Sequence, residues 1–343
     1  MAKYKNILYG STKPSSNLTG FPKLFKITLD ADIAAALALG GGIELYGPDG
    51  STPIPFGLYP STNLALGTIL FRALLDPLNS ASTGDVMGKL RYGSGLTTTE
   101  DKAATVVAYD KLFMPMEEDP SGSSPQMLNW KTNTKIGTSA NMTSANLVTG
   151  GVGSALNFVG PSSTKVTLSS ALTLGTVHTC QAWVKPNAQG GLFNFGGILG
   201  DGSSNTGPLY VAGANDTEFG YTIGAGGLGY TTSSMTGAWR LITAVRNGTA
   251  IELFLDGTSV ASGTLPANTA ASPDRIGIRN STFYYDGGLD EFIATTALLT
   301  ASWIGYCFQD GKNNGDTFSL SAEVDEGGGP AVQHLLASLG VGK

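Results

Sequence analysis

The sequence predicts an all-β protein, and three observations carry this prediction. Glycine is abundant, with 48 residues in a chain of 343, and charged residues make up only 13% while apolar residues reach 41%. This composition can build a large core with many turns, so the chain is not globally disordered. Short apolar and β-branched runs are separated by Asn-Gly and Asp-Gly pairs, which favour two-residue hairpin turns. Helical spacing of apolar residues is limited to two short segments, 32–39 and 331–339.

The chain length favours two domains with less compact ends. We expect an N-terminal arm at residues 1–20, a small β-sandwich domain at 21–108, a larger sandwich at 109–310 and a C-terminal tail with a short helix at 311–343. Both ends are rich in Gly, Ser and Pro and cannot bury enough apolar surface alone. We therefore expect them to attach the chain to neighbouring copies or to a particle; the alternative is that they fray in solvent.

In the small domain, the expected order is one strand, one helix and three further strands. Strands are predicted at 21–30, 43–46, 68–75 and 89–92, and a helical run at 32–39 is closed by three glycines. The letters GPDG at 47–50 predict a tight turn.

The larger domain is expected to begin with a strand at Tyr109 to Glu117. A long polar loop follows from Asp119 to Gly150. Loops of this length are uncommon inside compact domains. We expect Trp130, Ile136 and Leu147 to hold it as an Ω-like cover over the edge of the sandwich.

The centre of the larger domain is a three-stranded meander. Its strands are predicted at 239–246, 250–255 and 258–262. The connecting turns are Asn247-Gly248 and Asp256-Gly257, which are among the strongest local hairpin signals. Beyond Gln309 the composition changes, and Phe318 to Val324 predicts a last strand.

These motifs resemble the laminin-G-like, concanavalin A-type jelly roll. The strand after Trp239 and the F-x-D-G turn that follows it match that family, and three flanking pieces agree in order: GSALNF from Gly153, CQAWVKP from Cys180 and IGIRNSTFYYDGGLDEF from Ile276. The resemblance implies that Trp183 and Trp239 are buried core residues and that Asp290-Glu291 anchor the final strand. It leaves the ligand open, because this fold hosts lectins, adhesion modules and glycosidases alike.

Residues from about 4 to 110 resemble a small β-domain often found directly before laminin-G-like modules. The matching order is FP, IELYGPDG, GTILFRA and LRYG. In that family the closing strand ends in Y-Y-G-N. Here Arg91-Tyr92-Gly93-Ser94 keeps the turn but lacks the Asn.

Charge and hydropathy exclude several classes of partner. The formal net charge is −6 and no basic stripe is visible, which argues against nucleic acid. No run of about 18 apolar residues suggests a membrane span, and no secretory signal is visible at the start of the sequence. Cys180 and Cys307, the only cysteines, have apolar or aromatic neighbours, so we expect two buried free thiols. A disulfide is the alternative.

The sequence contains no catalytic pattern, so we predict that the protein is not an enzyme. Glycosidases on this fold place carboxylates at alternate strand positions, because alternate side chains share one face. The segment Glu323-Val324-Asp325-Glu326 lacks that pattern, so we interpret it as the solvated acidic end of a strand. His178 and His334 have no nucleophile or zinc-ligand context. The glycine-rich segment 224–229 does not open a helix, which favours a β-turn over a phosphate loop.

Ligand binding is assigned to aromatic and planar polar side chains. The exposed candidates for sugar binding are Tyr221, Tyr230, Tyr284 and Asp286, of which Tyr284 lies in the aromatic run Phe283-Tyr284-Tyr285 and Asp286 directly follows it. Some laminin-G-like modules bind calcium on the sandwich rim, and the resemblance places Asp201 and Asn280 at corresponding positions. The simpler interpretation of Asp201 is a turn former, which the sequence favours. No cofactor is expected to be required, and calcium is the optional ligand.

Two functional hypotheses follow. The first is a structural or adhesion component of a phage-like virion (a tail fibre, spike or capsid decoration) that assembles in the host cytoplasm and displays a lectin-like module for host-surface glycans. Its partners would be other virion proteins or further copies of itself in a homo-oligomer. The alternative is an extracellular carbohydrate-binding or carbohydrate-processing protein.

Overall fold

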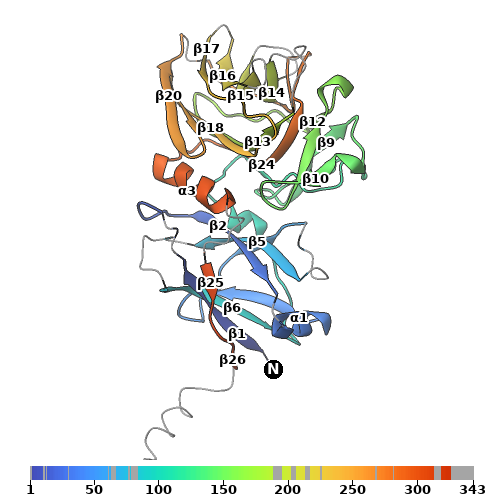
Figure 1. Ribbon diagram of the computed structural model, residues 1–343, viewed down its shortest axis with the longest axis vertical. Coiled ribbons are helices and arrows are strands. Elements are labelled where there is room, and N and C mark those ends of the chain that lie inside the picture. Colours follow the sequence, from blue (N-terminus) through green and yellow to red (C-terminus); the bar gives the residue numbers. More distant parts are fainter. Residues whose placement is uncertain are drawn as a thin grey trace, which may run out of the picture.

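The computed structural model shows two β-domains stacked end to end (Figure 1). It describes residues 2–10, 12, 14–29, 31–60, 62, 67–75, 78, 84–187, 195–201, 206–212, 217–224, 226–266, 269–280, 282–312 and 318–325. The small domain carries the N-terminus, the large domain lies at the opposite end of the molecule, and helix α3 (Ala301–Lys312) lies between them. The predicted helix at 331–339 lies outside the described residues. The all-β prediction is confirmed.

The small domain contains a five-stranded and a three-stranded antiparallel sheet. The five-stranded sheet has the order β25-β1-β6-β3, with β26 also paired to β1; its strands are β1 (Lys3–Tyr9), β3 (Gly42–Tyr46), β6 (Val86–Gly93), β25 (Phe318–Leu320) and β26 (Val324–Asp325). The three-stranded sheet has the order β2-β5-β4, with β2 (Phe21–Thr28), β4 (Phe56–Leu58) and β5 (Thr68–Leu75). Apolar residues such as Phe25, Phe71 and Leu90 form the buried core.

The two predicted ends of the chain meet in this sheet, which corrects the assignment of residues 1–20 to an arm. Strand β1 pairs with β6 on one side and with β25 and β26 on the other. Residues 3–9 form a strand of this sheet because alternate side chains, those of Lys5, Ile7 and Tyr9, are buried on one face. The strand predicted at 318–324 forms as β25 and β26, and it belongs to the small domain.

The large domain is a sandwich of two eight-stranded sheets. The first has the order β10-β11-β24-β13-β18-β19-β20, with β7 also paired to β24; its strands are β7 (Leu112–Met114), β10 (Leu147–Thr149), β11 (Ser154–Phe158), β13 (Val177–Pro186), β18 (Arg240–Asn247), β19 (Ala250–Leu255), β20 (Thr258–Thr264) and β24 (Gly287–Thr295). The second has the order β17-β16-β15-β14-β21-β12-β9-β8, with β8 (Met127–Asn129), β9 (Thr134–Ala140), β12 (Lys165–Leu168), β14 (Phe195–Gly200), β15 (Gly207–Ala212), β16 (Glu218–Ile223), β17 (Gly226–Thr231) and β21 (Arg275–Ile276). A two-stranded hairpin, β22 (Ile278–Arg279) and β23 (Phe283–Tyr284), completes the domain.

The predicted meander is confirmed as β18, β19 and β20. Leu255 pairs with Thr258, so Asp256 and Gly257 form a two-residue turn, and both have the positive φ angles that such a turn requires. The first turn is shifted by one residue, because Asn247 itself pairs with Ala250.

The expected loop from Asp119 to Gly150 contains three strands, which corrects the prediction of one continuous loop. Strands β8 and β9 form a hairpin at the edge of the second sheet, and β10 forms an edge of the first. Met127 and Trp130 are fully buried there. Burial of these few large side chains therefore outweighs the polar composition of the segment.

Helix content is higher than predicted. Besides α1 (Ala31–Ala38), the described residues contain α2 (Lys102–Thr105), α3 and the short 3-10 turns η2 (Ser144–Asn146) and η3 (Gly160–Ser162). In α3, Trp303, Ile304 and Cys307 face inward at helical spacing, and the Thr300 hydroxyl accepts a hydrogen bond from the Trp303 N–H, 3.3 Å away. The predicted burial of Trp183 is confirmed, whereas Trp239 is half-buried.

The contact between the domains contains a network of buried charges, which we call the seam. Lys23 and Arg72 come from the small domain, and Glu291 and Asp310 come from β24 and α3. The Lys23 ammonium lies 2.5 Å from Asp310 Oδ1, and Arg72 Nη2 lies 2.7 Å from Glu291 Oε2. Tyr59 donates to Glu291 and accepts from Arg72. All four charged side chains are almost fully buried, so the seam fixes the two domains against each other.

Candidate functional site

A group of polar and aromatic side chains lies on the outer face of the second sheet of the large domain. Strand pairing places it there. Phe219 pairs with Tyr230, and Phe219 belongs to the sandwich core. The residue directly before it in β16, Glu218, therefore points outward. Tyr210 pairs with Gly220 and lies on the same outer face as Glu218.

Four residues form this outer-face cluster: Tyr210, Glu218, Arg279 and Phe283. The Tyr210 hydroxyl donates to Glu218 Oε1 over 2.8 Å. The Arg279 guanidinium lies 5.4 Å from the centre of the Tyr210 ring and 5.1 Å from that of Phe283, within cation–π range. Arg279 and Phe283 pair across the β22–β23 hairpin, so the hairpin places both side chains in the outer-face cluster.

Glycines make room for the cluster. A Cβ atom at Gly220 would lie 2.8 Å from the Tyr210 hydroxyl, and one at Gly207 would lie 2.6 Å from Arg279 Cδ. A Cβ at Gly229 would collide with the Glu218 carboxyl group. The glycine-rich composition of this sheet therefore has a local cause, which is close approach of large side chains to the backbone.

The charges of the cluster are set by partial burial. Tyr210 and Arg279 are nearly covered, whereas Glu218 and Phe283 are half-buried. Burial raises the pKa of Tyr210, and the hydrogen bond to Glu218 raises it further, so the phenol stays protonated and remains a donor. Burial lowers the pKa of Arg279 while Tyr210 opposes this shift; an arginine nevertheless remains a cation. The cluster thus offers hydrogen-bond donors, carboxyl acceptors and an aromatic ring.

The structure separates the sequence-predicted sugar-binding residues. Tyr221 is fully buried in the core, where its hydroxyl accepts a hydrogen bond from Arg246 Nη1 over 2.9 Å, so its prediction as an exposed residue is wrong. Tyr230 lies on the core side of β17 and packs edge-on against Phe219. Tyr284 is half-buried in β23.

Asp286 lies half-buried beside the loop after β13. Its Oδ1 accepts a hydrogen bond from Asn187 Nδ2 over 3.0 Å. Its backbone carbonyl accepts a second one from the Asn187 N–H. Asp286 is therefore engaged in tying two strand ends together.

Asp201 and Asn280, the predicted calcium residues, lie next to each other. The Asn280 N–H donates to the Asp201 carbonyl over 3.0 Å, and Asn280 follows Arg279 directly. Among the described residues, no group of three or more His, Cys, Asp or Glu side chains could hold a metal ion. Calcium at this position stays a prediction. The described helices include none that is long and apolar enough to cross a bilayer.

Sequence reasoning missed three of the four cluster residues, although it noted Phe283 in an aromatic run. A signal was present: Tyr210, Glu218 and Gly220 alternate with apolar residues in strands flanked by glycine.

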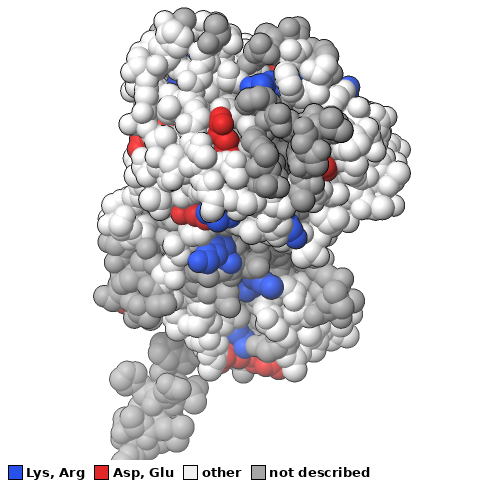
Figure 2. Space-filling model, turned by 45° about the horizontal axis from the view of Figure 1, so that its top comes forward, with Lys and Arg blue, Asp and Glu red and all other residues white. Residues whose placement is uncertain are grey.

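The visible face of the large domain carries only scattered charges, with no continuous basic stripe over its described part (Figure 2). Both cysteines are buried and free, as expected.

The fold of the large domain is an antiparallel jelly-roll sandwich. Residues 160–305 match the family described as the concanavalin A-like lectin/glucanases superfamily, so this part of the chain is a concanavalin A-like jelly-roll module. No curated protein gives a significant match to the sequence.

Several solved structures are similar to the chain at low identity. Domain 4 of an extracellular arabinanase from Geobacillus stearothermophilus, solved with arabinotriose, has 15% identity and a TM-score of 0.38, covering 57% of this chain and 98% of that one. The binding domain of botulinum neurotoxin DC, solved with SialylT, has 10% identity and a TM-score of 0.42, covering 60% and 52%. That of Paraclostridial Mosquitocidal Protein 1 has 15% identity and a TM-score of 0.43, covering 58% and 52%. The chain therefore matches about half the length of these toxin domains.

Proposed function

We propose that the jelly roll is a non-catalytic glycan-binding module and that the outer-face cluster is its binding surface. The observation that carries this proposal is the combination of a half-buried aromatic ring, a guanidinium and a carboxyl group on one sheet face. Binding pockets combine apolar or aromatic surface with a few placed polar groups. A sugar ring has an apolar face and equatorial hydroxyls, so it suits such a surface.

Each cluster residue has a distinct role in this proposal. Phe283 supplies the ring against which an apolar sugar face packs. Glu218 accepts hydrogen bonds from sugar hydroxyls, and Arg279 donates to sugar oxygens. The Tyr210 hydroxyl holds the Glu218 carboxyl in place, and the cation–π contacts restrict the guanidinium. A surface whose side chains are already fixed loses little conformational entropy on binding.

The location of the acidic segment near the C-terminus supports a non-catalytic function. Glycosidases need two carboxyl groups on either side of the scissile bond. Glu323, the first carboxyl of that segment, lies in the small domain and accepts hydrogen bonds from Lys3 and Tyr92. It is therefore an ion-pair partner of β1 rather than a member of the outer-face cluster.

We extend the proposal to a component of a phage-like virion that displays this module to host-surface glycans. The arrangement of the chain favours it: Lys3 and Asp325 pair in the small domain, at the end away from the jelly roll (Figure 1). Attachment through the small domain would leave the jelly roll facing outward. Immunogold labelling of purified particles from the source tests this role, with labels expected at a repeated position on the particle. Labelling confined to the medium would favour the extracellular alternative.

A glycan array with matched variants tests the binding proposal. Glu218→Gln and Phe283→Ala should each lower the signal for the bound glycan at least tenfold. Glu252→Gln is the control, because Glu252 is a half-buried carboxyl on the other sheet that also accepts from a hydroxyl, that of Ser259. Equal loss in all three variants, or binding unchanged in both cluster variants, would count against the outer-face cluster.

A further inference from the structure

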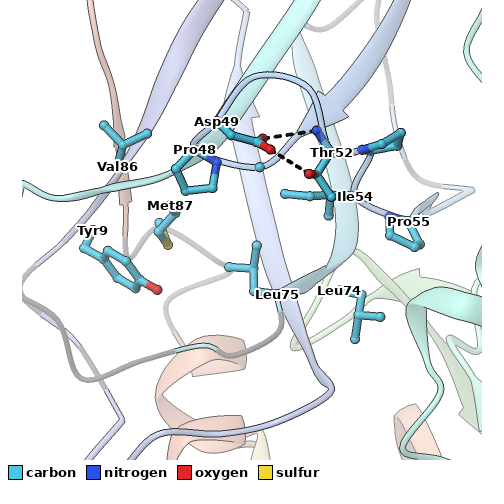
Figure 3. A pocket seen from close by; sticks show the side chains of 12 residues that line it. Tyr9, Pro48, Asp49, Thr52, Ile54, Pro55, Leu74, Leu75, Val86 and Met87 are labelled. Carbon is cyan, nitrogen blue, oxygen red and sulfur yellow. Dashed lines mark hydrogen bonds between the residues drawn. The ribbon is translucent and has the colours of Figure 1, made fainter.

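The small domain contains an apolar groove that the proposed glycan site does not use. It has a volume of about 590 Å³ and lies between the two sheets, beside the turn at Pro48 and Asp49 (Figure 3). Tyr9, Leu75 and Met87 form its buried floor, and Ile54 and Leu74 form half-buried walls. The volume is that of a pocket able to accept several apolar side chains.

The groove is preformed and offers little to a polar ligand. Pro48, Pro53 and Pro55 on its rim restrict the backbone. The side chain of Asp49 is occupied by its own turn: Oδ1 accepts from the Thr52 N–H over 3.1 Å, and Oδ2 accepts from the Thr52 hydroxyl over 2.6 Å (Figure 3). These bonds lower the pKa of Asp49, which keeps the turn charged and closed. The chemistry of the groove therefore selects an apolar occupant.

The sequence itself contains a matching segment. Residues 331–339, AVQHLLASL, carry Val332, Leu335, Leu336 and Leu339 at positions i, i+3, i+4 and i+7. This spacing places four apolar side chains on one face of a helix, which is the pattern of helices that bind in grooves. Eighteen residues, 326–343, follow the last described strand.

Strand register determines which groove this segment can reach. Asp325 pairs with Lys3 at one end of β1, whereas Tyr9 at the other end lines the groove. The chain therefore leaves β26 running away from its own groove, about 20 Å from it at about 3.3 Å per residue. The six steps from Asp325 to Ala331 span at most about 20–22 Å. To reach the groove of its own chain, the linker from Asp325 to Ala331 would have to turn back and be fully extended. To reach the groove of a neighbouring copy, the chain does not have to turn back.

We infer that residues 331–339 of one copy dock in the apolar groove of a neighbouring copy. Each chain then offers one groove and one segment, so the contact is heterologous and propagates through rings or filaments. Repetition over many copies gives avidity to a contact that is weak on its own.

Peptide binding tests the groove. A fluorescent peptide of residues 327–343 is titrated into a full-length tail variant carrying Leu335→Glu and Leu336→Glu, whose groove is intact. We expect saturable binding that weakens at least tenfold when Ile54→Glu is added. Leu39→Glu is the matched control, because Leu39 is 79% exposed on the same domain and away from the groove. Absence of binding, or equal loss with Leu39→Glu, overturns the inference.

Mixing full-length variants tests the neighbouring-copy geometry. The tail variant has only a groove, and Ile54→Glu has only a segment. Light scattering after chromatography should show that each alone is a monomer and that the mixture forms a one-to-one complex. If the peptide binds but the mixture stays monomeric, the segment does not reach the groove of a neighbouring copy. If the mixture associates but the unaltered protein is a monomer, the segment occupies its own groove. Either result overturns the inference. Glycan binding should be unchanged in every variant, so this result is separable from the proposed function.

Discussion

The core of the jelly roll and the seam between the domains are both buried, but they are built from opposite chemistry. The core is formed by apolar residues of two facing sheets, such as Leu253 of the first and Phe219 of the second. The seam buries Lys23, Arg72 and two carboxylates. Burying ions costs solvation energy that their mutual attraction only partly offsets, so a buried ion network adds little net stability. The core therefore supplies stability, while the seam specifies one orientation of the two domains.

The largest expected effect comes from breaking the seam on one side only. Arg72→Met leaves Glu291 buried without its guanidinium and should lower the free energy of unfolding by about 3–5 kcal/mol. Urea unfolding followed by tryptophan fluorescence measures it. The double variant Arg72→Met, Glu291→Met should recover much of the loss, because both charges are then gone. No recovery would mean that the seam contributes stability after all.

The core should respond to loss of volume alone. Leu253→Ala removes a fully buried side chain between the sheets and should cost about 3 kcal/mol through lost transfer energy and a cavity. The same urea assay measures it, with an unchanged orientation of the domains in small-angle scattering. A changed scattering profile would mean that the core also determines the orientation of the two domains.

The jelly roll also contains a buried histidine that should make it sensitive to acid. Burial and the nearby Arg246 charge lower the pKa of His178 to about 4. Since the folded pKa lies below the unfolded value near 6.5, stability is fully present above pH 6.5 and is lost as the pH falls toward 4. The loss should reach about 2–3 kcal/mol. His178→Phe, which can keep the stacking on Tyr221, should flatten this part of the pH profile; a parallel profile would exclude His178 as the cause.

The smallest effect is expected where a similar ion pair is exposed to water. Arg91 lies 2.8 Å from Glu44 on the small domain, and both are partly exposed. Arg91→Met should change the free energy of unfolding by less than about 1 kcal/mol. A cost as large as that of Arg72→Met would show that burial does not distinguish the two pairs.

Elements defined by neighbouring residues could be predicted from sequence. Strands β2 and β5, helix α1 and the Asp256-Gly257 turn follow from local spacing and turn chemistry. The pairing of β1 with β25 could not be predicted, because it joins residues more than 300 positions apart. Lys23 and Arg72 look like surface residues in the sequence, since nothing local reveals carboxylates approaching from another domain.

The candidate site shows a second limit. Sequence reasoning brought Asp201 and Asn280 together correctly, because the family resemblance supplied their positions. Sequence reasoning predicted that Tyr221 is exposed and did not identify Glu218 as a site residue. Both assignments depend on which face of β16 is buried. A shift of one residue exchanges the two faces. The alternation of Phe219, Tyr221 and Ile223 with Glu218, Gly220 and Thr222 was the signal for the buried face of β16.

The pairing of Lys3 with Asp325 has a mechanical consequence. A force pulling these two points apart acts on β26, β25 and β1 alone, and the jelly roll lies outside the loaded path. Because the pulled residues are opposite one another at the same end of an antiparallel pair, the strands separate one hydrogen-bonded pair at a time, like a zipper. The C-terminal strands would therefore peel away under a low force while both domains remain folded, and they could pair again when the force is released.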